Sequence, residues 1–343
     1  MSEPVSMSLD DVHGLTTRIL LGHGVSEQQT RAIANTVTNA ERDDCKSHGL
    51  FRVPGYVKSV VSGKVTIDAV PTVRDLAPGV IQVDGMAGFS PLALEMGRAP
   101  LIERARSQGI AALAVINAHH FAALWPEVEP IAEQGLAAFA CVDSFSYVAP
   151  AGGSKPLYGT NPIAFAWPRE NHPPLVFDQA TSASARGEIQ IHLRDGKPIP
   201  EGWAIGPDGQ PTTDPETALA GAQLPFGGYK GAALCLMVEL LAGALVGDVF
   251  SFEATARDNK DGGPPQGGEL IIAIDPSRCV TGDKRSGQLA RAEALFALIL
   301  EQDGTRLPSD RRYQARLTTP TEGISIPKSL HDTLLQLENP QPE

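Results

Sequence analysis

Hydrophobic side chains recur at helical spacing in the first part of the chain. One helix is predicted to begin after Ser8 and a second to span residues 26–45, because in each the apolar positions fall roughly on one face. Pro54 suits the first turn of a third, short helix that ends at Gly63. The pattern therefore predicts a helical N-terminal region, which we place at residues 1–75.

Further along, short apolar runs that are typical of buried strands alternate with helical segments. The predicted strands cover residues 80–84, 110–116, a run that ends at Val142, 163–167, 175–177 and 270–274. The predicted helices cover residues 91–108, 126–134, 229–247 and 284–301. We interpret Asp84-Gly85 as a turn and residues 262–268 as a surface loop. This alternation predicts the α/β (or α+β) class, with a sheet domain over 76–250 and a C-terminal segment, 251–343, that returns to the core.

Composition and charge indicate a soluble globular protein. The 343 residues are 42% hydrophobic and 20% charged, and a net charge of −12 without any basic run argues against a nucleic-acid-binding surface. The longest mainly apolar stretch, residues 231–247, carries Glu239 and is short for a membrane span, so we interpret it as a buried helix. No secretory signal is visible at the N-terminus, and the four cysteines show neither C-x-x-C spacing nor a paired framework. These features predict a cytoplasmic protein with reduced thiols and with no nucleic-acid or membrane partner.

The stretch Ser47-His48-Gly49, with Arg52 three residues later, combines three kinds of chemical group. A histidine can give or take a proton near neutral pH, and an arginine presents a planar fork that matches a carboxylate. Gly49 allows the backbone to approach a ligand closely. The alternative is an ordinary loop with local hydrogen bonds, which the tripeptide alone does not exclude.

A glycine-rich turn, Gly227-Gly-Tyr-Lys-Gly231, stands where the predicted helix 229–247 begins. Backbone N–H groups at the helix N-terminus, with Lys230, can hold a phosphate, and the alternative is a tight turn between a strand and the helix. The Gly-x-Gly-x-x-Gly and P-loop signatures are absent. Near the C-terminus, Arg306, Arg311 and Arg312 can grip a phosphate monoester or form a solvated surface.

Two acidic residues and a histidine pair have alternative interpretations. Asp178 or Glu188 can orient a catalytic imidazole, whereas the ordinary roles of such residues are helix capping and solvation. His119 and His120 are of a metal-binding type, but no third ligand lies at a recognisable spacing, so no metal is predicted.

Taken together, six motifs in order resemble the malate/L-lactate dehydrogenase-like family of NAD(P)H oxidoreductases, whose cofactor-binding sheet is not of the Rossmann type. The motifs are Ser47-His-Gly with Arg52, Gly159-Thr-Asn-Pro162, Asp178-Gln-Ala-Thr-Ser182, Pro200 to Trp203, Pro211-Thr212 with Asp214-Pro215, and Leu224-Pro-Phe-Gly-Gly228. Other segments resemble the Δ1-piperideine-2-carboxylate/Δ1-pyrroline-2-carboxylate reductases within the family. These segments are Ser47 to Tyr56, His119 to Pro130, Phe250 to Glu253 and Arg306 to Tyr313.

The resemblance implies NADPH-dependent reduction of a cyclic imino acid to L-pipecolate or L-proline by a homodimer. It implies that His48 is the proton donor with Ser47 and Glu188 as its relay, although an Asp is expected where this chain has Glu188, so Asp178 remains a rival. The implied substrate contacts are Arg52, Thr160, Arg186 and Gly187. The implied cofactor contacts are His120, Phe121, Ala122, Ala123, Leu124, Asp178, Gln179, Ala180, Tyr229, Lys230, Thr305, Arg306, Leu307, Pro308, Ser309, Asp310 and Arg311.

Three other functions compete with this one. The family motifs also fit a 2-hydroxy-acid dehydrogenase for malate, lactate, sulfolactate or ureidoglycolate, in which His48 would take the alcohol proton. A Ser/His hydrolase is disfavoured because neighbouring side chains rarely point at one another and no Gly-x-Ser-x-Gly elbow is present. A non-catalytic binding protein of the same fold remains open.

Overall fold

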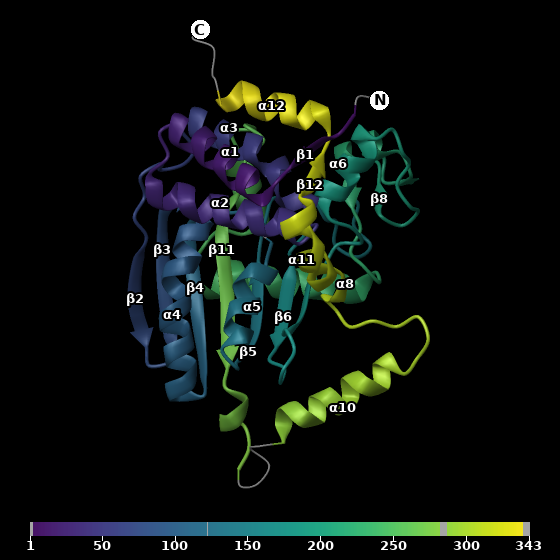
Figure 1. The fold of residues 1–343 in the computed structure, drawn as a ribbon. Helices are drawn as coiled ribbons and strands as arrows, with labels where there is room; N and C mark the ends of the chain where they lie inside the picture. Colours follow the sequence, from purple (N-terminus) through teal and green to yellow (C-terminus); the bar gives the residue numbers. More distant parts are fainter. Residues whose placement is uncertain (1–2, 122, 282–286, 339–343) are drawn as a thin grey trace.

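The first and last parts of the chain fold together into a helical layer. The computed structural model describes residues 3–121, 123–281 and 287–338. Helices α1 (Leu9–Gly22) and α3 (Val53–Val61) lie beside α12 (Lys328–Glu338), α2 (Glu27–Arg42) packs on α1, and strand β1 (Val5–Met7) pairs with β12 (Ile324–Ile326) (Figure 1). The three predicted N-terminal helices are thus confirmed. Ser8 caps α1 by accepting a hydrogen bond from the Asp11 backbone N–H at 3.0 Å.

A seven-stranded sheet forms the centre of the molecule. In spatial order its strands are β2 (Thr72–Ala77), β3 (Val80–Phe89), β4 (Ile110–His119), β11 (Gln266–Ile274), β5 (Ala137–Val142), β6 (Ile163–Trp167) and β7 (Leu175–Gln179). Only β3 and β4 run parallel, joined by the crossover helix α4 (Ser90–Gln108), and the other neighbours are antiparallel. The predicted α/β class is therefore confirmed as a mixed sheet between helices.

Different helices cover the two faces of this sheet. Helices α4 and α5 (Trp125–Glu133) pack on one face over a large apolar core, and α8 (Tyr229–Val238) with the π-helical segment η3 (Glu239–Leu245) packs on the other. The helix predicted at 229–247 is present, but it is not buried all round. Leu236, Leu240 and Leu245 are 45%, 50% and 66% exposed, because only one side of this helix meets the sheet.

Short elements fill the segment between β7 and α8, where the sequence predicted little regular structure. They are α6 (Arg186–Arg194), β8 (Ala204–Ile205), β9 (Pro211–Thr212), α7 (Pro215–Ala220) and β10 (Ala222–Gln223). The three strands form their own small sheet in the order β10-β8-β9. The remaining helical elements are α9 (Ser251–Arg257), η4 (Pro276–Arg278), α10 (Gln288–Leu300) and α11 (Asp310–Glu322).

Two local predictions are wrong. The turn expected at Asp84-Gly85 lies inside β3, which continues to Phe89 through a shift of pairing in which Met86 and Ala87 have φ values of 54° and 59°. The surface loop expected at 262–268 is largely buried, and its last three residues begin β11. Both predictions fail because residues that normally indicate a turn or a surface loop also occur at β-bulges and where two backbone segments pack closely.

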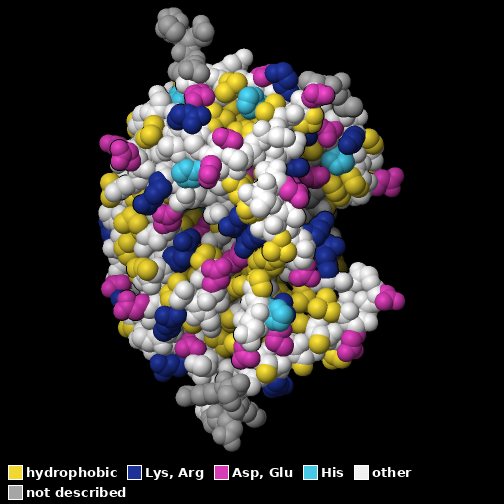
Figure 2. All heavy atoms as spheres, in the orientation of Figure 1, with side chains coloured by type: hydrophobic (Ala, Val, Ile, Leu, Met, Phe, Trp, Pro, Cys, Tyr) yellow, Lys and Arg dark blue, Asp and Glu magenta, His cyan; other side chains and the backbone are white. Residues whose placement is uncertain are grey.

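Helix α10 extends away from the rest of the chain (Figure 1). Of the predicted helix 284–301, residues 284–286 lie outside the described residues, and α10 covers 288–300. Its contacts include the Arg169–Glu293 ion pair at 2.7 Å and the buried Phe296, which lies under the Arg169 guanidinium. A cavity of about 700 Å³ lies between α5, α10, α11 and the turn after β6. Figure 2 shows acidic and basic side chains interspersed over the face of the molecule that Figure 1 presents. No helix among the described residues is both long and apolar enough to cross a membrane.

Candidate active site

The Ser47-His48-Gly49 segment forms the connection between α2 and α3. It consists of two 3₁₀ turns, η1 (Lys46–His48) and η2 (Leu50–Arg52), with Gly49 between them. The buried Glu41 carboxylate accepts a hydrogen bond from the Leu50 backbone N–H at 2.7 Å, and a Cβ at Gly49 would overlap that carboxylate. The close approach that Gly49 permits is therefore to Glu41, and a buried carboxylate holds the turn in place.

Ser47 and His48 form a hydrogen bond. The Ser47 Oγ lies 3.0 Å from the His48 Nδ1, and the edge of the His48 ring meets Trp125 at a centroid distance of 6.3 Å. Neighbouring side chains were expected not to point at one another, but the tight 3₁₀ turn brings those of Ser47 and His48 together. A hydroxyl on Nδ1 fixes the orientation of the imidazole, as the partner of a catalytic histidine does.

Arg52 is a partly buried cation with no carboxylate within ion-pair distance among the described residues. Its guanidinium lies over the rings of Phe51 and Phe121, at 5.4 and 5.0 Å, and its Nε is buried without a hydrogen-bond partner in this part of the chain. Burial lowers the pKa of Arg52. Gly187 lies beside it, because a Cβ there would stand 3.2 Å from an Arg52 terminal nitrogen and 3.5 Å from the Ser47 Cβ. Ser47, His48, Arg52 and Gly187 thus form one site.

A second guanidinium stands next to Gly187. Arg186 lies over the Tyr147 ring at 4.1 Å, and one of its terminal nitrogens donates to the Leu219 carbonyl at 2.9 Å. Burial raises the pKa of the Tyr147 hydroxyl. The first turn of α6 therefore places Arg186 and Gly187 next to Arg52 and Tyr147.

Thr160 is held in place by a carboxylate that sequence reasoning had noted only as a charge in an apolar helix. The buried Glu239 accepts hydrogen bonds from the backbone N–H of Gly159 at 3.2 Å, from the Asn161 side chain at 2.8 Å and from the backbone N–H of Ser251 at 2.9 Å. Thr160 therefore lies between Gly159 and Asn161, both of which are hydrogen-bonded to Glu239. A lone acidic residue in an apolar helix was the signal that could have identified this role.

Asp178 and Glu188, the two acidic candidates for the relay, differ in their hydrogen-bond and ion-pair partners. Asp178 Oδ2 accepts hydrogen bonds from the backbone N–H groups of Leu124, at 2.7 Å, and Trp125, at 3.0 Å, so it caps α5 as the ordinary alternative expected. Burial raises the pKa of Asp178 to about 6. The Glu188 carboxylate lies 3.8 Å from His192 Nε2, with 48% of its side chain exposed.

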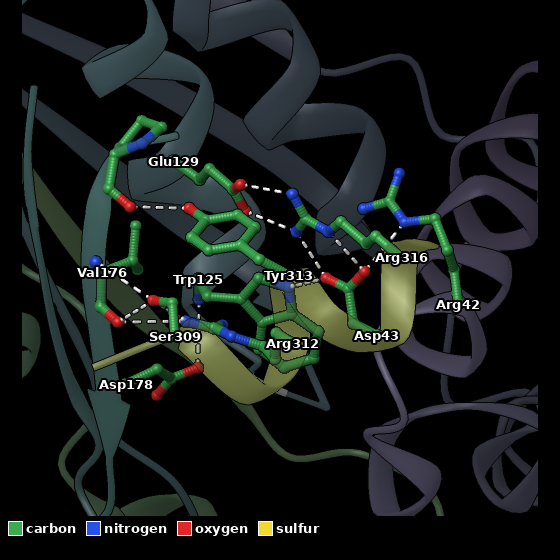
Figure 3. A network of polar contacts seen from close by, with 11 residues as sticks. Arg42, Asp43, Trp125, Glu129, Val176, Asp178, Ser309, Arg312, Tyr313 and Arg316 are labelled. Atoms are coloured by element: carbon green, nitrogen blue, oxygen red, sulfur yellow. Dashed lines mark hydrogen bonds and ion pairs between the residues drawn. The ribbon is translucent and has the colours of Figure 1, made fainter. Parts of the chain in front are cut away.

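The three arginines near the C-terminus differ in exposure. Arg312 turns inward, stacks on Trp125 at 5.1 Å and donates to the Val176 carbonyl at 3.1 Å and to Ser309 Oγ at 2.9 Å (Figure 3). Arg306 and Arg311 are exposed at the surface. Of the three arginines, Arg306 and Arg311 are therefore accessible to a phosphate-bearing ligand.

An ion-pair network that the sequence did not indicate lies behind the site (Figure 3). The fully buried Asp43 accepts hydrogen bonds from Arg42 at 2.8 Å, from the Trp125 indole at 2.9 Å and from Arg316 at 2.5 and 2.7 Å. Arg316 also binds Glu129 of α5. The network joins α2, α5 and α11, and Trp125 connects it to His48.

Comparison with known proteins identifies the family. The family model described as malate/L-lactate dehydrogenase matches residues 7–335. The chain belongs to this family. It is 54% identical, over 97% of this chain and 99% of the relative, to a Δ1-pyrroline-2-carboxylate/Δ1-piperideine-2-carboxylate reductase of Pseudomonas aeruginosa. It is 53% identical to a Δ1-pyrroline-2-carboxylate reductase of Ancylobacter novellus, over 98% of both chains.

A solved structure from the same family has the same fold. The crystal structure of Δ1-piperideine-2-carboxylate reductase from Pseudomonas syringae pv. tomato superposes with a TM-score of 0.91 at 43% identity, covering 97% of this chain and 99% of that chain. The resemblance expected from the six motifs is therefore confirmed.

The segments implied to bind a pyridine nucleotide, the cofactor of this dehydrogenase family, lie along strand β7 and its continuation. The Asp178 carboxylate accepts a hydrogen bond from the Leu124 backbone N–H, and Ser309 Oγ accepts one from the Val176 backbone N–H. An isolated β-bridge between Ser182 and Pro225 places the glycine turn at 227–231 next to the end of β7. Gly227 and Gly228 have φ values of 58° and 65°, and Tyr229 and Lys230 are exposed at the start of α8. The exposed glycine turn at the N-terminus of α8 fits a phosphate-bearing ligand. Ala122 lies outside the described residues.

The histidine pair next to these segments is buried. His120 Nε2 lies 3.0 Å from the Gly267 carbonyl oxygen and its Nδ1 lies 3.4 Å from Glu269, while burial lowers the pKa of His119 to about 4. Among the described residues no group of three or more His, Cys, Asp or Glu side chains is arranged to hold a metal ion.

The buried Glu41 predicts a pH-dependent stability. Burial raises its pKa to about 7 from an unfolded value of 4.5, so the folded state holds the proton more tightly and stability falls as pH rises through this window. Glu41→Gln keeps an acceptor for Leu50 without the charge. We expect its free energy of unfolding, relative to the parent, to rise by up to about 3 kcal/mol between roughly pH 5 and pH 8, measured by urea denaturation. A difference that does not change with pH would contradict this.

Proposed function

We propose that this protein is a pyridine-nucleotide-dependent reductase of cyclic 2-imino acids, acting on Δ1-pyrroline-2-carboxylate and Δ1-piperideine-2-carboxylate. The observation that carries the proposal is Arg52, a desolvated guanidinium without a carboxylate partner in the described part of the chain, next to the hydrogen-bonded Ser47–His48 pair. A carboxylate-bearing substrate supplies the missing anion. The 54% and 53% identical relatives named as such reductases support the same assignment.

The reduction requires one hydride at the ring carbon and one proton at the ring nitrogen, so that C=N becomes CH–NH. The reduced nicotinamide supplies the hydride when it is bound. Arg52 binds the carboxylate beside the imine carbon and thereby presents one face of the ring. His48, oriented by Ser47 through Nδ1, delivers the proton to nitrogen. Thr160, Arg186 and Gly187 line the substrate side.

We further propose a homodimer. Leu236, Leu240 and Leu245 lie on the outer side of α8 and η3, 45–66% exposed and spaced so that they form one apolar stripe. Contact with a second copy removes this surface from water. Sedimentation equilibrium should give twice the chain mass of 36.3 kDa, and a single-chain mass would contradict the proposal. A cytoplasmic location is consistent with this role, since all four cysteines are free thiols.

We expect the enzyme to prefer NADPH over NADH. The exposed Arg306 and Arg311 lie in the segment implied to bind the cofactor, and a phosphate held by one charged pair gains about 1.5–3 kcal/mol, so NADPH should be favoured over NADH roughly 10- to 150-fold in kcat/KM. Replacing either arginine with Ala should lower kcat/KM for NADPH and leave that for NADH unchanged. Arg291→Ala, on the exposed side of α10, is the matched control. Equal efficiencies of the parent with both cofactors would rule the preference out.

The proton donor is tested at His48. Because general acid catalysis contributes about 10²–10⁴-fold, His48→Ala should lower kcat by that factor while the Kd for NADPH, followed by fluorescence, stays nearly the same. His331→Ala, in α12, controls for the loss of a surface imidazole. A variant that keeps the parent kcat would remove His48 from the mechanism.

The substrate class is tested at Arg52. Arg52→Lys keeps the charge but not the fork, so kcat/KM for Δ1-piperideine-2-carboxylate should fall roughly tenfold or more. The loss should largely vanish for a cyclic imine without the carboxylate, which the parent should reduce poorly. Pyruvate and oxaloacetate are assayed in parallel at the NADPH absorbance band. Faster turnover of these oxo acids than of the imino acids would instead establish the 2-hydroxy-acid dehydrogenase.

A further inference from the structure

The Arg52 guanidinium contacts two aromatic rings. Its guanidinium carbon is 5.0 Å from the centroid of Phe121 and 5.4 Å from that of Phe51, both within the range of a cation–π contact. Its Nε is buried and makes no hydrogen bond to a described residue, and no carboxylate in that part of the chain pairs with it. The rings therefore restrain a long side chain that in most buried settings is held by acids.

The Phe121 ring is itself held from behind. It meets Tyr56 edge to face at a centroid distance of 4.9 Å, and Tyr56 meets the buried Phe89 at the same distance. Gly55 makes room for it, because a Cβ there would lie 2.6 Å from the Phe121 Cζ. A continuous row of rings thus runs from the core of the N-terminal helical layer to Arg52.

We propose that Phe121 is a positioning residue for the substrate carboxylate, because its ring fixes the orientation of the Arg52 guanidinium before substrate binds. The sequence motif implied a cofactor contact at this residue, but its ring is engaged by Tyr56 and Arg52. The proposal rests on the proposed function of Arg52. A guanidinium that is already oriented loses less conformational freedom when it binds the carboxylate.

The test compares Phe121→Leu with Phe89→Leu. Both remove a ring that meets Tyr56 edge to face at 4.9 Å, but only Phe121 contacts Arg52. For Phe121→Leu, KM for Δ1-pyrroline-2-carboxylate should rise about three- to thirtyfold, the range from an exposed to a desolvated cation–π contact, with kcat changed less. The Ki of pyrrole-2-carboxylate, an unreactive planar relative of the substrate, should rise by the same factor. The Kd for NADPH should stay at the parent value, and Phe89→Leu should change KM and Ki much less than Phe121→Leu does, because Phe89 reaches Arg52 only through Tyr56 and Phe121.

A second variant covers the case in which Phe121→Leu does not fold. Gly55→Ala keeps every ring but pushes the Phe121 edge aside, so it should raise KM and Ki in the same direction. Either variant that folds should lose the preference for the carboxylate substrate over Δ1-pyrroline, which lacks the carboxylate.

The outcomes distinguish a failure of the proposal for Phe121 from a failure of the proposed function of Arg52. If Phe121→Leu and Phe89→Leu have the same KM and Ki, or if Phe121→Leu affects both imines equally, Phe121 does not position Arg52. A rise in the Kd for NADPH with KM and Ki unchanged would return Phe121 to the cofactor side. If the parent enzyme shows no preference for the carboxylate imine, and Arg52→Lys acts on both imines alike, then the proposed function of Arg52 fails, whatever Phe121 does.

Discussion

The buried carboxylate of Asp43 is the contact on which the arrangement of the site depends. Burial alone would raise its pKa, but hydrogen bonds from Arg316 and Arg42 hold the pKa below its ordinary value, so the group is a paired anion. A charge buried this completely is tolerated only when its donors are fixed in place, and here they come from α2, α5 and α11 (Figure 3). Helices α2, α5 and α11 are therefore held together at the point where α2 ends and the Ser47-His48 turn begins.

Trp125 connects the buried Asp43 network to the His48 ring. Its indole nitrogen donates to Asp43, its backbone N–H donates to Asp178, and the Arg312 guanidinium lies over its ring. Two carboxylates and one cation thus fix a single aromatic side chain, whose remaining edge meets His48. The role proposed for His48, delivery of a proton to one atom of a bound ring, requires neighbours that do not move, and Trp125 is such a neighbour.

The sequence predicted those parts of the molecule that depend on neighbours along the chain. Helix caps such as Ser8, the apolar strand runs and the Ser47-His48-Gly49 motif are local signals, and the structure has the corresponding elements. The Asp43–Arg316 pair joins residues 273 positions apart, and no local pattern identifies which acid an arginine will meet. The same reason explains why Gly49 was assigned to a ligand when its neighbour is Glu41, and why residues 262–268 were expected at the surface. In each case the deciding partner comes from elsewhere in the fold.

Two partly buried arginines, Arg316 and Arg52, differ in the partners that surround them. Burial would lower the pKa of Arg316, but hydrogen bonds to Asp43 and Glu129 raise it well above the ordinary value, so that cation is neutralised within the protein. Arg52 undergoes the same desolvation and has aromatic rings where Arg316 has acids. An unpaired buried cation makes folding less favourable, and a protein that tolerates this cost can recover it when a ligand brings the anion. The difference between these two guanidiniums, more than the presence of an arginine in the motif, supports a carboxylate-binding site at Arg52.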